Sequence, residues 1–342
     1  SQIPKDLDVQ ILPEGGHAVT GLPSVYGVII KDAGGYGVSG AIGRITDSSG
    51  EDVTRFQVNR FGIGRLEFTP GDNEVYYARL RYLNRDYKIP LPPAEPEGVS
   101  LRLSDLRDKV GITLKARFRD AARADAPFYL TVHNGDSLKG IPVSLGKGAE
   151  NLKVFPKEDL YKGVNVFTLF DPEGNPLLER LYFNDHGMVF RDTMVGYSSR
   201  EKDSLKIQLS LNGLNPEYFN SLSVSILPGS SKAYRGHHNL PSYSLLQPYV
   251  RGPIQNAWYY FQEISAEKRH ELDNLLLTQG WSSYDWNTVS NHPPLYRFDF
   301  EKGISYTVQF NKRGSDSFYI YPTANNPSQL LKLKEGEVDF TV

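Results

Sequence analysis

Cysteine is absent from the 342 residues of this chain, which excludes disulfides, cysteine metal ligands and thiol nucleophiles. A secreted β-protein without disulfides has to rely on its hydrophobic core, so this absence leaves the compartment open. The chain also lacks a large excess of charge of either sign. Its 38 Lys and Arg residues nearly balance its 40 Asp and Glu residues, which gives a net charge of −2. Nucleic-acid binding therefore has no electrostatic footprint in the sequence, and we expect no nucleic-acid partner.

Long apolar runs are also missing. No run approaches the ~20 residues that a membrane-spanning helix requires, so we expect no membrane-spanning segment within this chain. The sequence shows no signal peptide and begins directly on a strand-like segment, and we expect it to be a fragment of a longer protein. Its 39% hydrophobic and 23% charged residues are typical of a folded globular chain.

Short strands and turns are abundant instead. The stretch Asp8–Gly40 alternates at its start, breaks at Glu14-Gly15-Gly16, continues as a mostly apolar strand at Val25–Lys31 and turns again at Asp32–Gly35. This spacing of short strands and turn residues predicts β-sandwiches and argues against a helical fold. We therefore predict an all-β chain of tandem immunoglobulin-like sandwiches.

The pattern divides the chain into four regions. We predict one sandwich in residues 1–95, a second in 96–185, and a third in 186–287 that carries a helical insertion at about 242–280. Residues 288–342 are predicted to be either a partial β-domain or strands that complete the third sandwich. The prolines of 90–96 fix φ and remove hydrogen-bond donors, which favours a linker there.

One helix is predicted in the third region, over Ser265–Gly280. The Ser265 hydroxyl suits an N-cap, and Glu267 suits the positive end of the helix dipole. Leucines at 272, 275 and 276 form one apolar stripe, and Gly280 suits the residue after the helix.

The motifs that resemble catalytic or binding signatures are better explained structurally. The segment Phe61–Gly64 contains a G-x-G pattern. A dinucleotide-binding site would also need a third glycine and a helix after it, and both are missing here. The S-x-x-K spacing of serine acylases occurs at Ser199 and Ser265, but the S-D-N and K-T-G elements that accompany it in those enzymes are missing. The seven histidines are scattered, and the adjacent pair His237-His238 would point to opposite faces of a strand. We predict no catalytic residue, no metal site and no cofactor.

Aromatic residues near the predicted helix are the best candidates for binding. Exposed aromatic side chains stack on sugars or anchor partner proteins, whereas buried ones only attach the helix to a sandwich. Both interpretations remain open for the cluster of Trp258, Tyr259, Tyr260, Trp281, Tyr284 and Trp286.

The order of several short motifs over residues 7–287 resembles the macroglobulin-like domains of large Bacteroidetes cell-envelope proteins. These relatives of bacterial α2-macroglobulins are associated with TonB-dependent receptors and carboxypeptidase-regulatory-like domains. The matching segments are Pro13–Leu22, Phe61–Pro70, Gly163–Leu181, Tyr197–Lys202 and Leu275–Trp281. The resemblance implies sandwich modules at the bacterial envelope, in the periplasm or at the outer membrane. The thioester chemistry of protease-trapping macroglobulins needs a cysteine, so it is not carried over.

We therefore expect a non-catalytic structural or interaction module, a multi-domain arm of an envelope protein. Its partners would be other envelope proteins or further domains of the same chain. One alternative is a carbohydrate- or peptide-binding module that uses the aromatic residues of 258–286. A further alternative is a hydrolase whose site assembles only in three dimensions.

Overall fold

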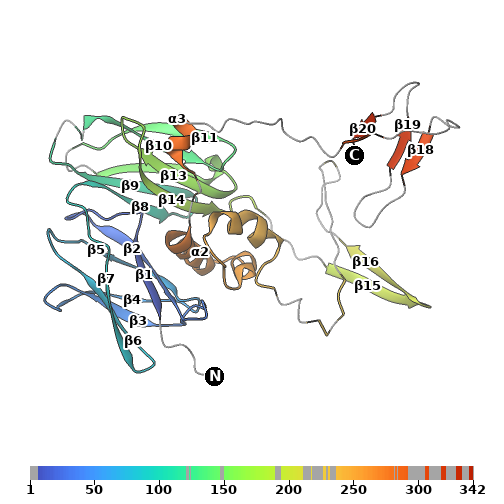
Figure 1. Cartoon of the computed structure of the whole chain (residues 1–342), viewed down its shortest axis with the longest axis horizontal. Helices are drawn as coiled ribbons and strands as arrows, with labels where there is room; N and C mark the ends of the chain where they lie inside the picture. The colour runs from blue at the N-terminus through green and yellow to red at the C-terminus, as the bar shows by residue number, and fades with distance from the viewer. Residues whose placement is uncertain are drawn as a thin grey trace. The chain divides into compact units, whose positions relative to one another are not determined.

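The computed structural model divides the chain into two compact parts, residues 1–286 and 287–342, which are described separately. It describes residues 7–341 except for 121–122, 124, 147–149, 189–193, 211–216, 218–225, 229, 232–235, 281, 283, 292–304, 308–316, 321–328 and 333–338. The described elements are mostly antiparallel strands with few helices (Figure 1), which confirms the predicted all-β fold.

The first sandwich consists of a three-stranded and a four-stranded sheet, in the orders β1–β2–β5 and β4–β3–β6–β7. Alternate residues of both sheets point into one core, which contains Tyr26, Val28 and Ile30 from the central strand β2. The strands are β1 (Asp8–Pro13), β2 (Ser24–Lys31), β3 (Ile42–Thr46), β4 (Asp52–Gln57), β5 (Ile63–Phe68), β6 (Tyr77–Tyr82) and β7 (Arg85–Pro90).

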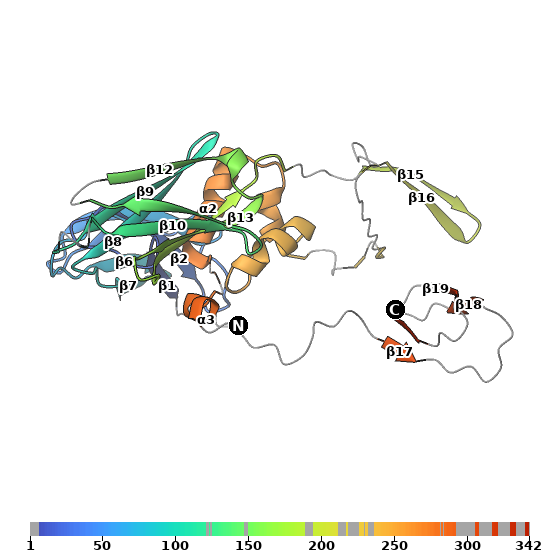
Figure 2. The same ribbon diagram turned by 90° about the horizontal axis from the view of Figure 1, so that it is seen from above.

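The second sandwich pairs the sheets β11–β10–β13–β14 and β12–β9–β8. Figure 2 shows its long strands running side by side. Its core includes Ile112 and Leu114 of β9 and Phe128 of β10. The strands are β8 (Gly98–Asp105), β9 (Lys109–Arg117), β10 (Pro127–His133), β11 (Leu138–Ser144), β12 (Glu150–Pro156), β13 (Gly163–Phe170) and β14 (Pro176–Asn184).

Strand β7 was not expected from the sequence. It pairs with β6 through a two-residue turn in which Leu83 and Asn84 both have positive φ, 47° and 61°. Such a turn normally carries Asn-Gly or Asp-Gly, so Leu-Asn gave no hairpin signal. The strand itself, RDYKIP, has exposed and half-buried residues only, which is the pattern of a sheet edge.

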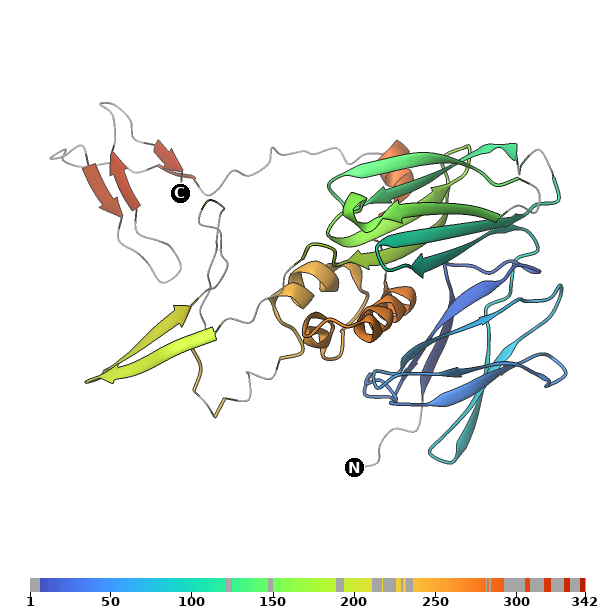
Figure 3. The ribbon, with the colours of Figure 1, turned by 180° about the vertical axis from the view of Figure 1, so that it is seen from behind.

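The helix α2 (Ala266–Gln279) packs against both sandwiches. The inner residues of β2 face the first core, whereas Ile29 joins Leu272 and Leu276 of α2 in a separate apolar cluster. Val164 and Leu181 of the second sandwich belong to the same cluster. Helical turns at Ser242–Leu246, Gln247–Tyr249 and Ala257–Phe261 complete this helical segment, and Figure 3 shows it beside the strands of both sandwiches.

The two ends of α2 differ in how well the sequence predicted them. The hydroxyl of Ser265 accepts a hydrogen bond from the amide of Lys268 at 3.2 Å, as expected for an N-cap. Gly280, however, has φ −63° and ψ 133° and does not adopt the left-handed conformation of a typical glycine cap. Its role is steric, because a Cβ there would lie 2.2 Å from the carbonyl oxygen of Leu276.

The remaining described elements are short. In the described residues of 186–287 the strands are β15 (Met194–Glu201) and β16 (Ser204–Ser210), which form a hairpin. The sequence also predicts a strand over residues 222–227, which lies mostly outside the described residues. The described residues of the second compact part form two strand pairs. They are β17 (Ser305–Thr307) with β20 (Asp339–Thr341), and β18 (Ser317–Ile320) with β19 (Gln329–Lys332). The helix α3 (Trp286–Asn291) spans the division between the two parts.

No helix among the described residues has the length and apolar character needed to cross a membrane.

The close approach of β2 and α2 gives a first prediction. A Cβ on Gly27 would lie 2.6 Å from Cγ2 of Thr278 and 3.0 Å from Cγ of Leu277. We expect Gly27→Val to force the helix away from the sheet and to lower the free energy of unfolding by about 1–3 kcal/mol. Urea denaturation measures this change.

The control for this variant is Gly140→Val on β11, where an added Cβ would have Cγ2 of Thr131 as its nearest neighbour, at 3.7 Å. We expect the control to change the free energy of unfolding by less than about 0.5 kcal/mol. Equal stabilities for the two variants would contradict the packing of α2 on β2.

Candidate functional site

A buried cluster of four charged side chains lies where the two sandwiches and helix α2 meet. Arg180 of β14 is its centre, with a side chain only 2% exposed. Its Nε donates to Oε1 of Glu14 at 2.7 Å, and its Nη2 donates to Oδ1 of Asp273 at 2.7 Å. Arg65 of β5 binds the other oxygen of Asp273 at 2.5 Å. One cluster therefore joins the end of β1, the strands β5 and β14, and the helix α2.

The cluster contains two carboxylates and two guanidinium groups, and the two acids differ in environment. Burial raises the pKa of Glu14 above its ordinary value, and Arg180 only partly opposes this effect. Oε2 of Glu14 has no hydrogen-bond partner among the described residues. Burial would also raise the pKa of Asp273, but Arg180 and Arg65 together hold it below its ordinary value. Asp273 is therefore the ion that the two arginines stabilise best.

Further contacts fix the two sandwiches to each other around this cluster. Gly15 has φ +83°, and a Cβ there would lie 3.0 Å from Cδ2 of Leu178 in the second sandwich. Arg117 of β9 donates two hydrogen bonds to Asp72 of the first sandwich, at 2.7 and 3.0 Å. Arg102 of β8 pairs with Glu67 of β5 at 2.7 Å. The contact between the sandwiches thus combines close packing with paired charges.

An open cleft of about 740 Å³ lies beside the cluster and is lined by both sandwiches and by α2. A hollow of about 510 Å³ shares Arg107, Lys157 and Arg269 with it. Two of these cations have a close partner, because Lys157 lies 2.5 Å from Asp105 and Arg269 lies 2.8 Å from Asp185. The charges of the cleft are therefore largely neutralised within the protein.

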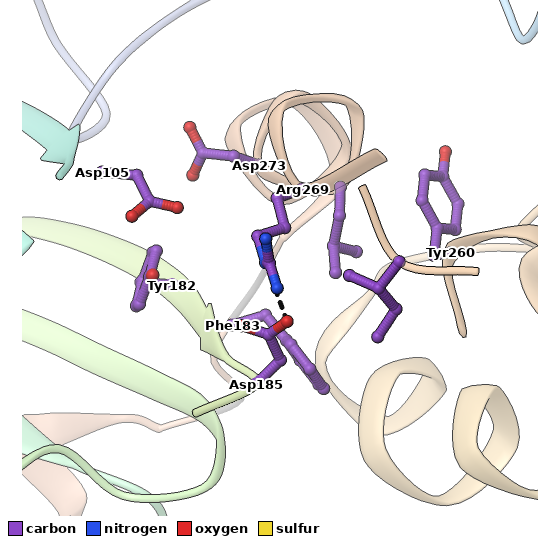
Figure 4. Close-up of a pocket in the computed structure, with 9 residues that line it drawn as sticks. Asp105, Tyr182, Phe183, Asp185, Tyr260, Arg269 and Asp273 are labelled. Carbon is purple, nitrogen blue, oxygen red and sulfur yellow. Dashed lines mark hydrogen bonds and ion pairs between the residues drawn. The ribbon is translucent and has the colours of Figure 1, made fainter. Parts of the chain in front are cut away.

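Figure 4 shows an enclosed pocket beside this cleft, with Arg269 reaching toward Asp185. The space between Tyr182, Tyr260 and Asp273 is about 10 Å³, which is about the volume that one water molecule needs. Burial raises the pKa of both tyrosines, so they stay neutral at ordinary pH. This pocket cannot hold a metabolite.

The cleft brings together residue types that a hydrolase would use, namely Ser104, His270 and Asp273. An acyl-transfer site requires the base to be within hydrogen-bond reach of its partners. Within the described part of the chain, His270 forms no hydrogen bond to either of the other two, and both oxygens of Asp273 are bound by arginines. Burial and the nearby Arg65 lower the pKa of His270. The geometry therefore provides no oriented nucleophile and base here.

In the described ranges of the chain, no group of three or more His, Asp and Glu side chains is arranged to hold a metal ion.

The first group of predicted aromatic residues lies in the helical turn Ala257–Phe261. Trp258 and Tyr259 are half-buried, and Tyr260 is buried in the cluster around α2. The hydroxyl of Tyr259 donates to Glu271 at 2.6 Å, and the guanidinium of Arg60 lies 4.0 Å from its ring centroid. Tyr259 and Tyr260, whose rings both contact Phe61, connect the helical segment to the first sandwich.

The second group lies against the second sandwich. The rings of Tyr284 and Trp286 stack at 5.6 Å, and both contact His133 edge-on. Tyr284 is 37% exposed, so part of its ring is available to a ligand. Trp281 lies outside the described residues. The binding role of these aromatic residues stays a prediction.

The charge cluster itself was not identified from the sequence. The sequence nevertheless contains a signal for this cluster. Asp273 directly follows Leu272 beside the apolar stripe of α2, and Arg180 lies between Leu178 and Tyr182 on one face of β14. A charge within an apolar pattern indicates a buried, paired group. The partners remained unknown, since 166 residues separate Arg180 from Glu14.

No protein-family model matches this chain, and no match was found among curated proteins. Among solved structures, the chain is similar to a segment of two fibronectin type III domains from chicken tenascin, with 14% identity over 53% of this chain and 99% of that chain and a TM-score of 0.20. It is also similar to Salmonella α2-macroglobulin reacted with methylamine, with 12% identity over 61% of this chain but 17% of that chain and a TM-score of 0.19.

A third similar structure is a DUF3823 family protein from Bacteroides ovatus, with 8% identity over 51% of this chain and 95% of that chain and a TM-score of 0.20. Likenesses at this level carry no functional conclusion. The protein is a chain of tandem β-sandwiches, as its own sheets define it.

The buried cluster gives a second prediction. Arg180→Met leaves Glu14 and Asp273 buried without their shared partner, and we expect it to lower the free energy of unfolding by about 3–5 kcal/mol. The matched control is Arg102→Met, which removes a pair whose side chains are 52% and 44% exposed, and it should cost only about 0–1 kcal/mol. Guanidinium denaturation of both variants checks this difference, and similar values would contradict the central position of Arg180.

Proposed function

We propose that the chain is a non-catalytic structural and interaction module that serves as a rigid arm of a bacterial cell-envelope protein. The observation that carries the proposal is the contact of Arg180 with both Glu14 and Asp273. It requires the first sandwich, the second sandwich and helix α2 to be in place together. Contacts between domains of one chain usually permit relative motion unless the interface is large and hydrophobic. Here an apolar cluster shared by both sandwiches and α2 surrounds the charged one.

The envelope location is supported by the resemblance to macroglobulin-like domains, and the arm would lie in the periplasm or at the outer membrane. The absence of cysteine fits a domain that depends on its core for stability. An arm of this kind spaces and presents other domains of the same protein, or other envelope proteins, at a fixed angle.

Distance measurement between spin labels tests the rigidity. Because the chain has no cysteine, Ser49→Cys and Ser137→Cys place one label on an exposed turn of each sandwich without background labelling. We expect one narrow distance distribution in the parent protein. Arg180→Met should broaden it, because the shared partner of the two domains is lost, and Arg102→Met should not. A broad distribution in the parent protein would refute the rigid arm.

A carbohydrate- or peptide-binding role is a second candidate, favoured by the partly exposed Tyr284, which stacks on the half-buried Trp286. An exposed tyrosine ring of this kind suits the face of a sugar ring. We expect xylohexaose or maltohexaose to quench the tryptophan fluorescence and Tyr284→Ala to weaken binding by about tenfold.

The control is Tyr36→Ala, which removes an exposed tyrosine elsewhere in the chain. Binding that is equally weakened by both variants, or no binding to either oligosaccharide, would count against this role. The rigid arm would be unaffected by that result.

A further inference from the structure

The outer face of the sheet β4–β3–β6–β7 carries a continuous row of cations. Arg55 lies directly opposite Arg44, Arg44 opposite Arg79, and Arg79 opposite Lys88, so each strand of the sheet contributes one cation. Arg81 lies on the same face, two residues after Arg79. Strands in a sheet are about 4.8 Å apart, so the row extends over about 14 Å. Like charges directly opposite each other are unfavourable in a sheet, and this arrangement has three such pairs in succession.

Acidic residues compensate only part of this charge. Asp52 lies 3.4 Å from Arg44 and 3.7 Å from Arg55, and Asp86 lies 4.0 Å from Arg81. Arg79 and Lys88 have no carboxylate within ion-pair distance among the described residues. The face thus has an excess of positive charge on a protein whose net charge is −2.

Neutral contacts position the two uncompensated cations. Nε of Arg79 donates to the hydroxyl of Thr46 at 3.1 Å, and the ammonium of Lys88 lies 3.8 Å from the ring centroid of Tyr77. Both interactions orient a cation without neutralising it, and the guanidinium of Arg79 keeps donors for another acceptor.

The row lines a groove of about 540 Å³ on the face of the sheet. Its side chains include five cations, Arg44, Arg55, Arg79, Arg81 and Lys88, and one acid, Asp86. Guanidinium groups bind carboxylates and sulfates through paired hydrogen bonds, and a row of them suits a chain with repeated anionic groups.

We infer that this face binds an acidic polysaccharide, a linear chain carrying carboxylate or sulfate groups, which lies across the four strands. A protein partner needs apolar and aromatic anchors, whereas Ile42, 64% exposed, is the only large aliphatic side chain of the groove lining that points outward. A single-stranded nucleic acid needs free aromatic rings for base stacking. Tyr77 is covered by Lys88, and Tyr87 of the groove lining packs against the core of the first sandwich. A groove also suits a chain better than the flat surface of a membrane. This site is independent of the rigid arm.

Calorimetric titration of the whole chain tests the inference, with a heparin hexasaccharide and a hexamer of galacturonic acid as probes. We expect binding that weakens as salt is added, because exposed charges are screened. The double variant Arg44→Gln, Arg79→Gln should weaken binding by about tenfold or more. Its side chains lie on the outer face and not in the core, so the fold should persist, and a thermal midpoint near that of the parent protein verifies this.

The matched control is Arg200→Gln, Lys206→Gln on the hairpin β15–β16, which changes the net charge equally at exposed positions and should alter affinity less than about twofold. Three results would overturn the inference. They are no binding of either oligosaccharide, equal loss in the two double variants, and tighter binding of single-stranded DNA or of vesicles rich in anionic lipid. The last result would assign the face to a different polyanion.

Discussion

The two hydrogen bonds from Arg180 to Glu14 and Asp273 are the constraint on which the rest of this structure depends. Two carboxylates and two arginines leave the cluster without net charge, which is the condition under which ions can be buried at all. A buried ion pair adds little stability compared with apolar residues, but it strongly penalises every arrangement that separates its members. The cluster therefore specifies how the sandwiches and α2 fit together more than how stably each one folds.

The apolar surroundings of the cluster follow from the strands that carry it. Strand β2 is buried over nearly its whole length, because one of its faces lines the first core and the other contacts α2. Strand β14 likewise contributes Leu178 to the second core and Leu181 to the cluster around α2. Each sandwich thus has apolar residues outside its own core that pack against the helical segment. Removal of that segment would expose both surfaces together, which couples the folding of the three parts.

Local features of this fold could be predicted from the sequence, and features that depend on strand pairing could not. The alternation of β-strands and the Ser265 cap are encoded within a few residues, and both were predicted correctly. Strand β7 was missed because its turn uses an unusual residue pair. The Arg180 cluster joins residues 166 and 93 positions apart. The cationic row likewise arises from the register of four strands, which brings Arg44 and Arg55 beside the cations of the basic stretch 79–88.

The buried cluster and the cationic row show two opposite ways of placing arginine. Arg180 has lost its water and is surrounded by acceptors, so its charge is used entirely within the protein. Arg79 is held by a neutral hydroxyl and Lys88 by an aromatic ring, so their charge still acts on the surroundings. Repulsion along the row persists in the free protein and would be relieved by an added anion. The proposed rigidity and the proposed ligand binding therefore depend on different residues, and evolution could change one without the other.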